Sequence, residues 1–432
     1  MPEWQKVNLP QIFLILLTKM THSMKPIFLT LIFFAGSLQT HAGDWPQWRG
    51  SDRTDISQET GLLKTWPEGG PKRLWMSRDG GLGYSGFSIV DGKLFTLGLI
   101  DGKSHLLSFD AATGRKIWST DFGEHFENKW GNGPRGTPTV DDSNIYTLSA
   151  RGQLICAKVS DGSIVWKREL VKELGGKVPG WGYCESVLVD GNLVVCTPGG
   201  KKGLMAALDK KTGKTVWTSQ AFPDGAQYSS IIPIEHNGVR QYVQLTQKAL
   251  SGVNASDGKL LWRTPWTGRT AVIPTPIYDD GHVYISSGYG VGCKLVKLGG
   301  SEPREVYVNK NMKNHHGGVI KYGDHLFGYS DGGGWLCQDF KSGEIVWNNK
   351  KGLTKGAIAC ADGKFYLLEE STGTVALIDA SAKGWTERGR FKLSPQTTQR
   401  KPAGKVWTHP VISNGRLYLR DQEIIYCYDV RG

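Results

Sequence analysis

Short apolar segments alternate with polar turns along most of the chain. Pairs of these segments flank Asx-Gly turns, as where residues 187–189 and 193–195 enclose Asp190-Gly191. Apolar runs joined by such a dipeptide predict a β-hairpin. Eight hairpins are predicted, with turns at residues 91–92, 142–143, 190–191, 237–238, 280–281, 323–324, 362–363 and 414–415. The turns Asp142-Ser143 and Gly323-Asp324 are imperfect copies of the pattern.

A second motif, Asp-x-x-Thr-Gly-x-x-x-Trp, recurs in phase with the hairpins. One copy reads Ser108, Asp110, Thr113-Gly114 and Trp118, and a degenerate copy lies at residues 297–307. A buried indole needs a small residue opposite it, and Ser108, Ala207 and Gly252 suit that place. We therefore interpret the repeated tryptophans as packing residues rather than as a stacking site. They are Trp75, Trp118, Trp166, Trp217, Trp262 and Trp347.

Each repeat thus predicts four strands, with an Asx-Gly turn after the first and a Thr-Gly turn before the last. A period of 40–50 residues with four strands is typical of a β-propeller blade. We predict an all-β, eight-bladed propeller of four-stranded antiparallel blades over residues 43–432, with one short helix at 168–174. The chain ends without the last tryptophan of its final repeat. We expect the strand around Trp75 to complete that blade, so that the N- and C-terminal strands close the ring.

The N-terminal residues predict export. Within residues 24–42, Lys25 precedes an apolar stretch at 27–38, and Ala42 ends a small-residue cleavage site. We interpret residues 1–42 as a signal peptide whose real start is Met24, with an uncleaved anchor as the alternative. No cysteine stands directly after the apolar stretch, where a bacterial lipid anchor would be attached. The prediction is a periplasmic or secreted protein without a later transmembrane helix.

Composition and charge narrow the partners. The formal charge is +12, yet no Lys/Arg run is long enough for a nucleic-acid tract, so we expect no nucleic-acid partner. We also expect a monomer. Seven cysteines are present. Those at 156, 337 and 427 share one repeat position and predict small core residues. Cys184 and Cys196 are expected on the two neighbouring inner strands of one blade, so they are the pair to test for a disulfide, with free thiols as the alternative. No His/Cys cluster has metal-ligand spacing, so no metal site is predicted.

The repeat resembles that of the PQQ-like (quinoprotein) propeller family, which includes PQQ-dependent alcohol dehydrogenases and the assembly lipoprotein BamB. The resemblance covers residues 44–432, and residues 44–50, Asp-Trp-Pro-Gln-Trp-Arg-Gly, resemble the start of a secreted bacterial subgroup. It implies either a dehydrogenase that uses PQQ and Ca²⁺ on an alcohol or sugar, or a BamB-like scaffold for outer-membrane protein assembly. The chain has neither the adjacent Cys-Cys pair of those dehydrogenases nor the lipid-anchor cysteine of BamB.

Blade geometry places the candidate site. The connections between blades lead into the innermost strands, so their side chains should ring the channel mouth, on loops of the kind that carry function. The candidates are Trp130, Arg135, Trp181, Tyr228, His315, His316, Lys355, Trp407 and His409. This aromatic and basic set suits a flat aromatic anion, a sugar or an acidic peptide. Our first hypothesis is a binding module for a small ligand or a protein partner, while Trp130, Trp181 and Trp407 as structural plugs remain the alternative.

Overall fold

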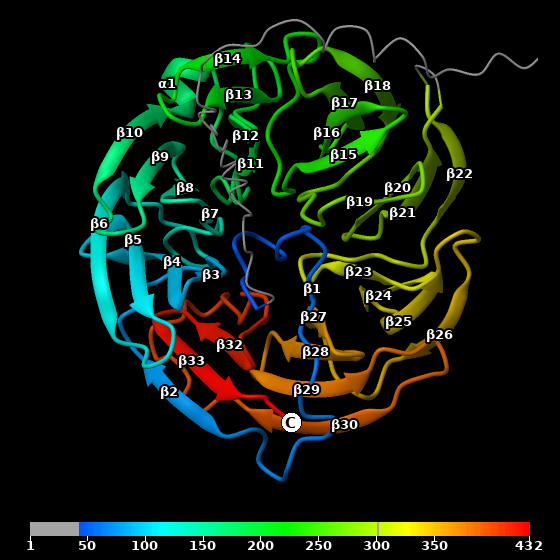
Figure 1. Cartoon of the computed structure of the whole chain (residues 1–432). Coiled ribbons are helices and arrows are strands. Elements are labelled where there is room, and N and C mark those ends of the chain that lie inside the picture. The colour runs from blue at the N-terminus through cyan, green and yellow to red at the C-terminus, as the bar shows by residue number, and fades with distance from the viewer. Residues whose placement is uncertain (1–42, 300–301) are drawn as a thin grey trace, which may run out of the picture. The chain divides into compact units, whose positions relative to one another are not determined.

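The computed structural model describes residues 43–299 and 302–432, and these residues form eight sheets arranged as a ring, each with four antiparallel strands (Figure 1). The predicted eight-bladed β-propeller is confirmed. Within each sheet the strands run from the channel to the outer rim, where the last strand of each sheet lies (Figure 1). Residues 1–42, including the expected signal peptide, lie outside the described residues.

The first four blades contain β3 (Ser88–Val90), β4 (Lys93–Ile100), β5 (Lys103–Asp110) and β6 (Lys116–Glu124); β7 (Thr139–Asp141), β8 (Asn144–Leu148), β9 (Gln153–Lys158) and β10 (Ile164–Glu169); β11 (Leu188–Asp190), β12 (Leu193–Cys196), β13 (Ala206–Asp209) and β14 (Thr215–Thr218); β15 (Ile232–His236), β16 (Val239–Leu245), β17 (Ala249–Asn254) and β18 (Leu260–Pro265). The fifth to seventh contain β19 (Ile277–Asp279), β20 (His282–Ser287), β21 (Gly292–Lys297) and β22 (Arg304–Asn309); β23 (Val319–Tyr322), β24 (His325–Ser330), β25 (Gly334–Asp339) and β26 (Ile345–Asn349); β27 (Gly356–Ala361), β28 (Lys364–Glu369), β29 (Thr374–Asp379) and β30 (Glu387–Lys392). The eighth contains β31 (Val411–Ser413), β32 (Arg416–Asp421), β33 (Ile424–Asp429) and β2 (Arg73–Ser77).

The predicted Asx-Gly turns join the two innermost strands of each blade. Asp91 and Gly92 both have positive φ, at 48° and 70°, as do Asn414 and Gly415, at 55° and 68°. Two left-handed residues make a type I′ turn, whose twist matches that of the flanking strands. This local requirement explains why Asn, Asp and Gly mark the hairpins so regularly.

The ring closes between segments at opposite ends of the described chain. Strand β2 pairs antiparallel with β33, and Trp75 lies opposite Cys427. The predicted closure is therefore confirmed. It gives the eighth blade the outer strand that the C-terminal sequence does not supply, and it leaves no open gap between first and last blades.

The repeated tryptophans connect neighbouring blades. Trp217 faces Ala207 across its own sheet and packs on Gly258 in the turn of the next blade. Its Nε1 donates a hydrogen bond to the carbonyl of Ala255 at 3.0 Å in that same turn. Trp75, Trp118, Trp166 and Trp347 make the same kind of bond to the following blade. For Trp75, Trp118, Trp166 and Trp217, the turn of the following blade therefore presents both a carbonyl and a glycine.

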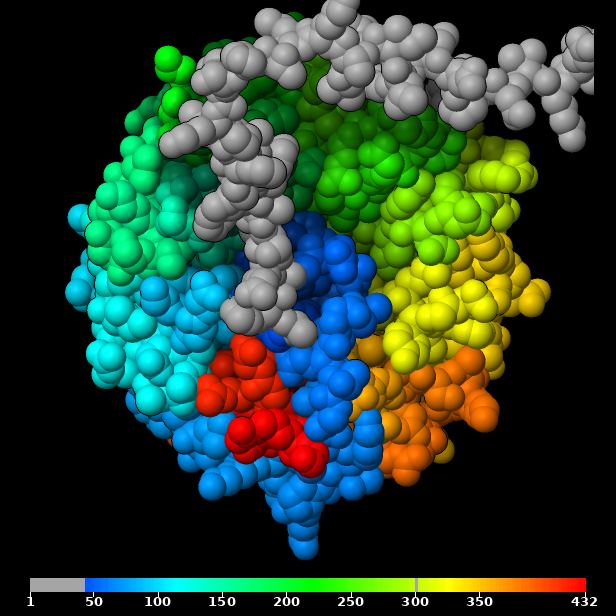
Figure 2. Space-filling view, in the orientation of Figure 1, coloured from blue at the N-terminus to red at the C-terminus, as the bar shows by residue number. Residues whose placement is uncertain are grey.

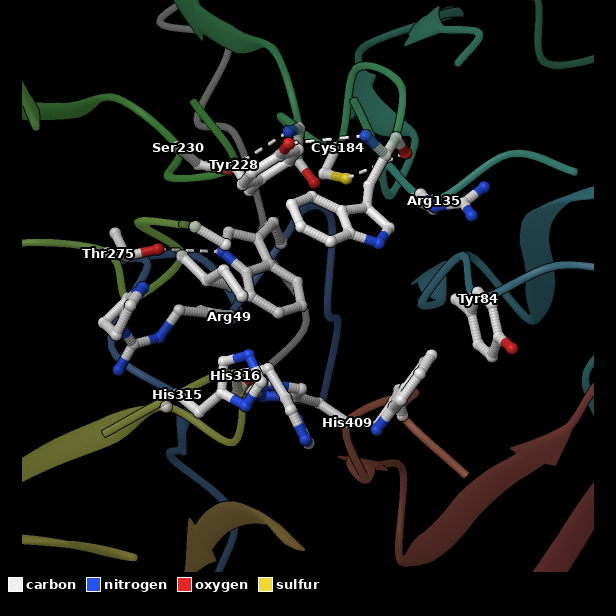
Figure 3. A pocket seen from close by; sticks show the side chains of 18 of the residues that line it. Arg49, Tyr84, Arg135, Cys184, Tyr228, Ser230, Thr275, His315, His316 and His409 are labelled. Atoms are coloured by element: carbon white, nitrogen blue, oxygen red, sulfur yellow. Dashed lines mark hydrogen bonds between the residues drawn. The ribbon is translucent and has the colours of Figure 1, made fainter. Parts of the chain in front are cut away.

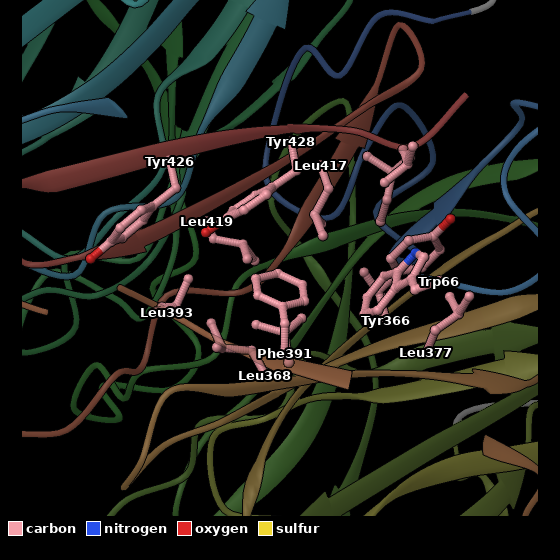
Figure 4. Close-up of a cluster of buried hydrophobic side chains, with 14 of the residues drawn as sticks. Trp66, Tyr366, Leu368, Leu377, Phe391, Leu393, Leu417, Leu419, Tyr426 and Tyr428 are labelled. Carbon is pink, nitrogen blue, oxygen red and sulfur yellow. The ribbon is translucent and has the colours of Figure 1, made fainter. Parts of the chain in front are cut away.

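The seventh blade lacks the repeated tryptophan and has Gly389 at that position, opposite Leu377. Trp66, from the segment before β2, occupies the space: a Cβ on Gly389 would lie 2.7 Å from the Trp66 Cβ. Its ring centroid lies 5.4 Å from that of Phe391, within the cluster between the seventh and eighth blades shown in Figure 4. The N-terminal segment thus supplies both a strand and a core side chain for closure.

Residues 44–57 plug the centre of the ring. Trp45 exchanges backbone hydrogen bonds with Ile89 of β3, and strand β1 (Ile56–Ser57) pairs in parallel with β27. Figure 2 shows these N-terminal residues, in blue, filling the middle of the face seen there. No local sequence pattern predicts this plug, because its partners are dispersed over several blades.

The cysteine prediction needs one correction. Cys184 does not lie on an inner strand, because β11 begins only at Leu188, and every cysteine of the described residues is a free thiol. Cys184 belongs to the connection between the second and third blades. The predicted short helix is present as α1 (Leu170–Leu174). Among the described residues, no helix has the length and apolar character needed to cross a membrane.

Candidate functional site

A cavity of about 230 Å³ lies at the centre of the ring, on the side of the connections between blades (Figure 3). Most of its lining comes from these connections, and the plug contributes Trp48 and Arg49. The lining is mainly aromatic and basic. Its titratable and aromatic members are Trp48, Arg49, Tyr84, Trp130, Arg135, Trp181, Cys184, Tyr228, Tyr289, His315, His316, Trp407 and His409.

The structure gathers nearly all the residues named from the sequence around this one cavity. Lys355 is the exception, because it lies behind His315 and contacts that side chain rather than the open space. Trp48 and Arg49 were missed as site residues. Both lie in the opening motif at residues 44–50, whose sequence indicates only a family resemblance.

The plug forms one wall of the cavity through buried ionic contacts. Arg49 Nε lies 2.7 Å from Asp55 Oδ2, and its Nη2 donates to the carbonyl of Val319 at 2.6 Å. Trp48 Nε1 donates to Thr275 Oγ1 at 3.1 Å, and its ring meets His409 edge-on at 4.7 Å between centroids. These contacts fix Trp48 and neutralise Arg49.

A second buried arginine anchors the plug beneath this wall. Arg53 donates to the carbonyls of Val187 at 2.6 Å and Ile231 at 2.8 Å. Burial lowers the pKa of Arg53 to about 10, although Glu185 opposes that shift. Burial also raises the pKa of Glu185 to about 7, although Thr197 and Arg53 stabilise its carboxylate.

Arg135 is the cation of the cavity without a carboxylate partner. Its guanidinium donates to the carbonyls of Gly133 and, at 2.7 Å, Gly131, and lies 4.8 Å from the Phe126 ring centroid. Within residues 43–299 and 302–432, no Asp or Glu forms an ion pair with it. Burial lowers its pKa, although it remains the charged form near neutral pH. A guanidinium held in this way leaves a positive charge for an incoming anion.

His316 belongs to a hydrogen-bonded group with Glu370 and Trp407. Glu370 Oε2 accepts from His316 Nε2 at 2.5 Å and from Trp407 Nε1 at 2.8 Å. Burial lowers the pKa of His316. Burial alone would raise the pKa of Glu370, but these donors lower it to about 2. The result is a carboxylate that is fully used in orienting the imidazole and the indole.

The adjacent His315 has a different polar partner, Lys355. Lys355 Nζ lies 2.6 Å from His315 Nδ1 and 2.9 Å from Asp331 Oδ1. Burial lowers the pKa of His315 to about 3, and the adjacent His316 and Lys355 add to that shift. His315 is therefore neutral across the physiological range.

Cys184 lies beside Trp181 and Tyr228 on another side of the cavity (Figure 3). Burial raises the pKa of its thiol to about 11. Because the thiolate is the nucleophilic form, this cysteine is a poor nucleophile. Trp181 and Tyr228 meet edge-on at 5.5 Å between ring centroids.

The lining does not fit calcium. Ca²⁺ takes six to eight oxygen ligands, usually including carboxylates. In the described part of the chain no Asp or Glu lines the cavity, and the nearby Asp55, Asp331 and Glu370 are engaged by Arg49, Lys355 and His316. No group of three His, Cys, Asp or Glu suited to a metal occurs in that part either. The PQQ and calcium chemistry implied by the resemblance therefore has no ligand set here.

The comparisons with known proteins agree with the fold. A family model described as outer membrane protein assembly factor BamB matches residues 102–349. BamB of Yersinia pestis is 22% identical over 347 residues, which are 75% of this chain and 68% of that protein. Tetrathionate hydrolase of Acidithiobacillus ferrooxidans is 27% identical over 209 residues, 45% of this chain, and the match spans only 40% of that protein. The quinohemoprotein alcohol dehydrogenase of Comamonas testosteroni, at 11% identity and a TM-score of 0.61, covers 90% of this chain and is itself covered to 81%, so it shows the shared fold alone.

Proposed function

The chain belongs to the family of the outer membrane protein assembly factor BamB, and from that premise we propose that it is an exported binding protein whose central cavity takes a small, flat anion. Export to the periplasm rests on the signal predicted at residues 1–42. We propose binding rather than PQQ-dependent oxidation because the carboxylates that calcium would need are engaged elsewhere.

The observation that carries the proposal is Arg135. Arg135 lines the cavity, and within the described residues its guanidinium donates to backbone carbonyls instead of to a carboxylate. The other cations near the cavity, Arg49 and Lys355, are neutralised by Asp55 and Asp331. An anionic ligand would supply the missing countercharge, whereas a neutral sugar would not.

The shape of the cavity favours a planar ligand. Trp48, Trp181 and Trp407 offer flat apolar surfaces from three separate segments. A cavity of roughly 150 Å³ holds benzene, so the present cavity of about 230 Å³ has room for two fused rings. A two-ring carboxylate therefore matches both the charge and the walls.

Titration with 2-naphthoate and its uncharged analogue 2-naphthamide tests this proposal. We expect the carboxylate to bind at least roughly tenfold more tightly, since charge-assisted hydrogen bonds contribute about 1.5–3 kcal/mol. Arg135→Gln should abolish that preference. Arg151→Gln is the matched control, because Arg151 contacts Phe126 near the mouth without lining the cavity. Equal binding of both probes, or an unchanged preference in Arg135→Gln, would contradict the proposal.

A second candidate is a scaffold role in which the rim of the ring contacts another protein. The family membership favours it, and so do apolar side chains exposed on outer strands, among them Val216 at 52% and Val308 at 57%. Edge strands that expose such side chains are sites for strand pairing with a partner. Co-purification with outer-membrane assembly components that is lost in Val216→Lys and Val308→Lys would support this role, and co-purification without loss would contradict it.

A further inference from the structure

We propose that His315 Nε2 donates a hydrogen bond to an uncharged acceptor on the ligand. This acceptor lies at the opposite end of the ligand from the ligand's anionic group. This inference rests on the proposed function and deepens it, because it specifies the ligand class. The ligand would be a flat anion that carries a carbonyl, such as a ketone or an amide, at its far end.

The two recognising groups lie on opposite sides of one cavity. Arg135 comes from the connection before β7, between the first and second blades, whereas His315 comes from the connection before β23, between the fifth and sixth. These connections are half a turn apart in a ring of eight blades. Figure 3 shows the two residues across the drawn pocket from each other. A rigid ligand can therefore reach both groups only by spanning the cavity.

Lys355 determines which nitrogen of His315 carries the proton. An ammonium group donates and cannot accept, so Nδ1, at 2.6 Å from Lys355 Nζ, must present its lone pair. The ammonium is itself held by Asp331 at 2.9 Å. In a neutral imidazole the proton then resides on Nε2, and the Lys355 contact fixes the ring as a donor.

The Nε2 donor is available to a ligand. His315 lines the cavity, and across the described residues no protein group accepts a hydrogen bond from Nε2. The ring is further placed by an edge contact with Tyr289, at 4.6 Å between centroids, and by His316 at 5.1 Å. A neutral N–H that is fixed before binding polarises a carbonyl without the need for a proton transfer.

The surrounding charges favour an uncharged acceptor at this end. The groups that face His315 are Lys355, His316 and Tyr289. Behind them lie two carboxylates, Asp331 paired with Lys355 and Glu370 bonded to His316. Lys355 is already paired with Asp331, and Glu370 would repel a second anionic group. A carbonyl oxygen accepts from Nε2 without that repulsion.

The experiment compares 6-acetyl-2-naphthoate with 6-isopropenyl-2-naphthoate, which have the same shape and the same acid group. Only the acetyl compound has an acceptor at the far end. We expect it to bind about three- to tenfold more tightly to the wild-type protein, as one neutral hydrogen bond predicts. In His315→Phe this ratio should fall to one, and in His315→Gln, whose amide nitrogen can replace Nε2, it should be partly restored.

Lys355→Met tests the positioning role separately. The variant should lower the ratio and should move the proton of His315 between the two ring nitrogens, as seen by ¹⁵N NMR of histidine-labelled protein. Lys351→Met is the control, because the exposed Lys351 side chain does not line the cavity. A merely structural role for Lys355 would alter stability while leaving the ratio and the tautomer unchanged.

The outcomes separate this inference from the proposed function. Equal affinity for the two acetyl and isopropenyl probes, or a ratio unchanged in His315→Phe, overturns the role of His315. The preference for 2-naphthoate over 2-naphthamide and its loss in Arg135→Gln would still stand in that case. If no naphthoate binds, the proposed function fails and this inference fails with it.

Discussion

The tryptophans between blades and the tryptophans around the cavity are the same residue type in two different settings. Between blades, Trp217 is 8% exposed and its N–H is bonded to the next blade. At the cavity, Trp181 is only partly buried, and in the described structure its indole N–H, like that of Trp130, donates to no protein acceptor. Trp217 is therefore satisfied within the fold, whereas Trp181 and Trp130 each keep an unused N–H donor at the cavity; Trp48 and Trp407, in the same lining, donate to Thr275 and Glu370.

The largest expected effect is a difference in the free energy of unfolding between variants of the two kinds of tryptophan. Trp217→Ala should lower the free energy of unfolding by about 3–5 kcal/mol, because it opens a cavity and leaves the Ala255 carbonyl without its donor. Trp181→Ala should change that free energy by less than about 1 kcal/mol. Urea unfolding of both variants measures this difference.

The same pair of variants should show the reverse order in ligand binding. Trp181→Ala should weaken 2-naphthoate binding, while Trp217→Ala, under conditions where it remains folded, should not. If Trp181→Ala destabilised the protein as strongly as Trp217→Ala, the mouth tryptophans would be structural plugs, the alternative that the sequence left open.

A smaller effect should arise from the buried carboxyl of Glu185, which makes the free energy of unfolding depend on pH. The apolar packing of Trp217 between blades should give no such dependence. The folded-state pKa of Glu185 is raised from 4.5 to about 7 by burial, so its protonated form favours the fold. Its stabilising effect is complete below about pH 4.5 and is lost as the pH rises through 7. In Glu185→Gln this loss is removed, so the variant should gain on the order of 3 kcal/mol relative to wild type between pH 4.5 and 8.

Chemical denaturation of both proteins at several pH values measures that relative gain. Glu173→Gln is a control, because Glu173 is exposed and pairs with Arg168 at the surface. A difference between wild type and Glu185→Gln that does not vary with pH would show that folding does not raise the pKa of Glu185.

The smallest expected effect is on stability in Arg135→Gln. Removal of a partly buried charge that has no carboxylate partner is favourable, while the loss of its bonds to Gly131 and Gly133 is not. The two contributions should leave the free energy of unfolding within about 1 kcal/mol of wild type, as thermal or urea unfolding can measure. A loss above about 2 kcal/mol would instead make Arg135 a structural residue of its loop.

The predictable part of the fold is the part governed by local rules. A type I′ turn requires two left-handed residues, so Asp91-Gly92 is visible in the sequence. The same holds for the turn that receives each repeated tryptophan. The plug is different, since Arg49 and Arg53 bind carbonyls that are more than 130 residues away and no local pattern marks those partners. The role of Trp66 could not be predicted for the same reason. Its side chain fills the space left by the missing tryptophan at Gly389, which is distant in sequence.

The sequence predicted that the candidate residues lie close together, but it did not predict how their charges pair. The repeat pattern places residues such as Arg135 and His315 in connections between blades, and it thereby predicts that they lie at one channel mouth. It could not show which charges are neutralised, because Glu370 lies in a turn that looks ordinary in the sequence and Asp55 lies in the plug. The free charge on Arg135 is visible only after these pairs are known.

The pairing of β2 with β33 has a consequence for the order of folding. Arg73 and Tyr428 are among the partners, so a ribosome makes one strand of this sheet long before the other. Contacts this distant in sequence have a high entropic cost of loop closure and form late. Until then the Trp75 and Trp66 side chains have no complete partner surface, so we expect the nascent ring to depend on factors that shield apolar segments until the chain is complete.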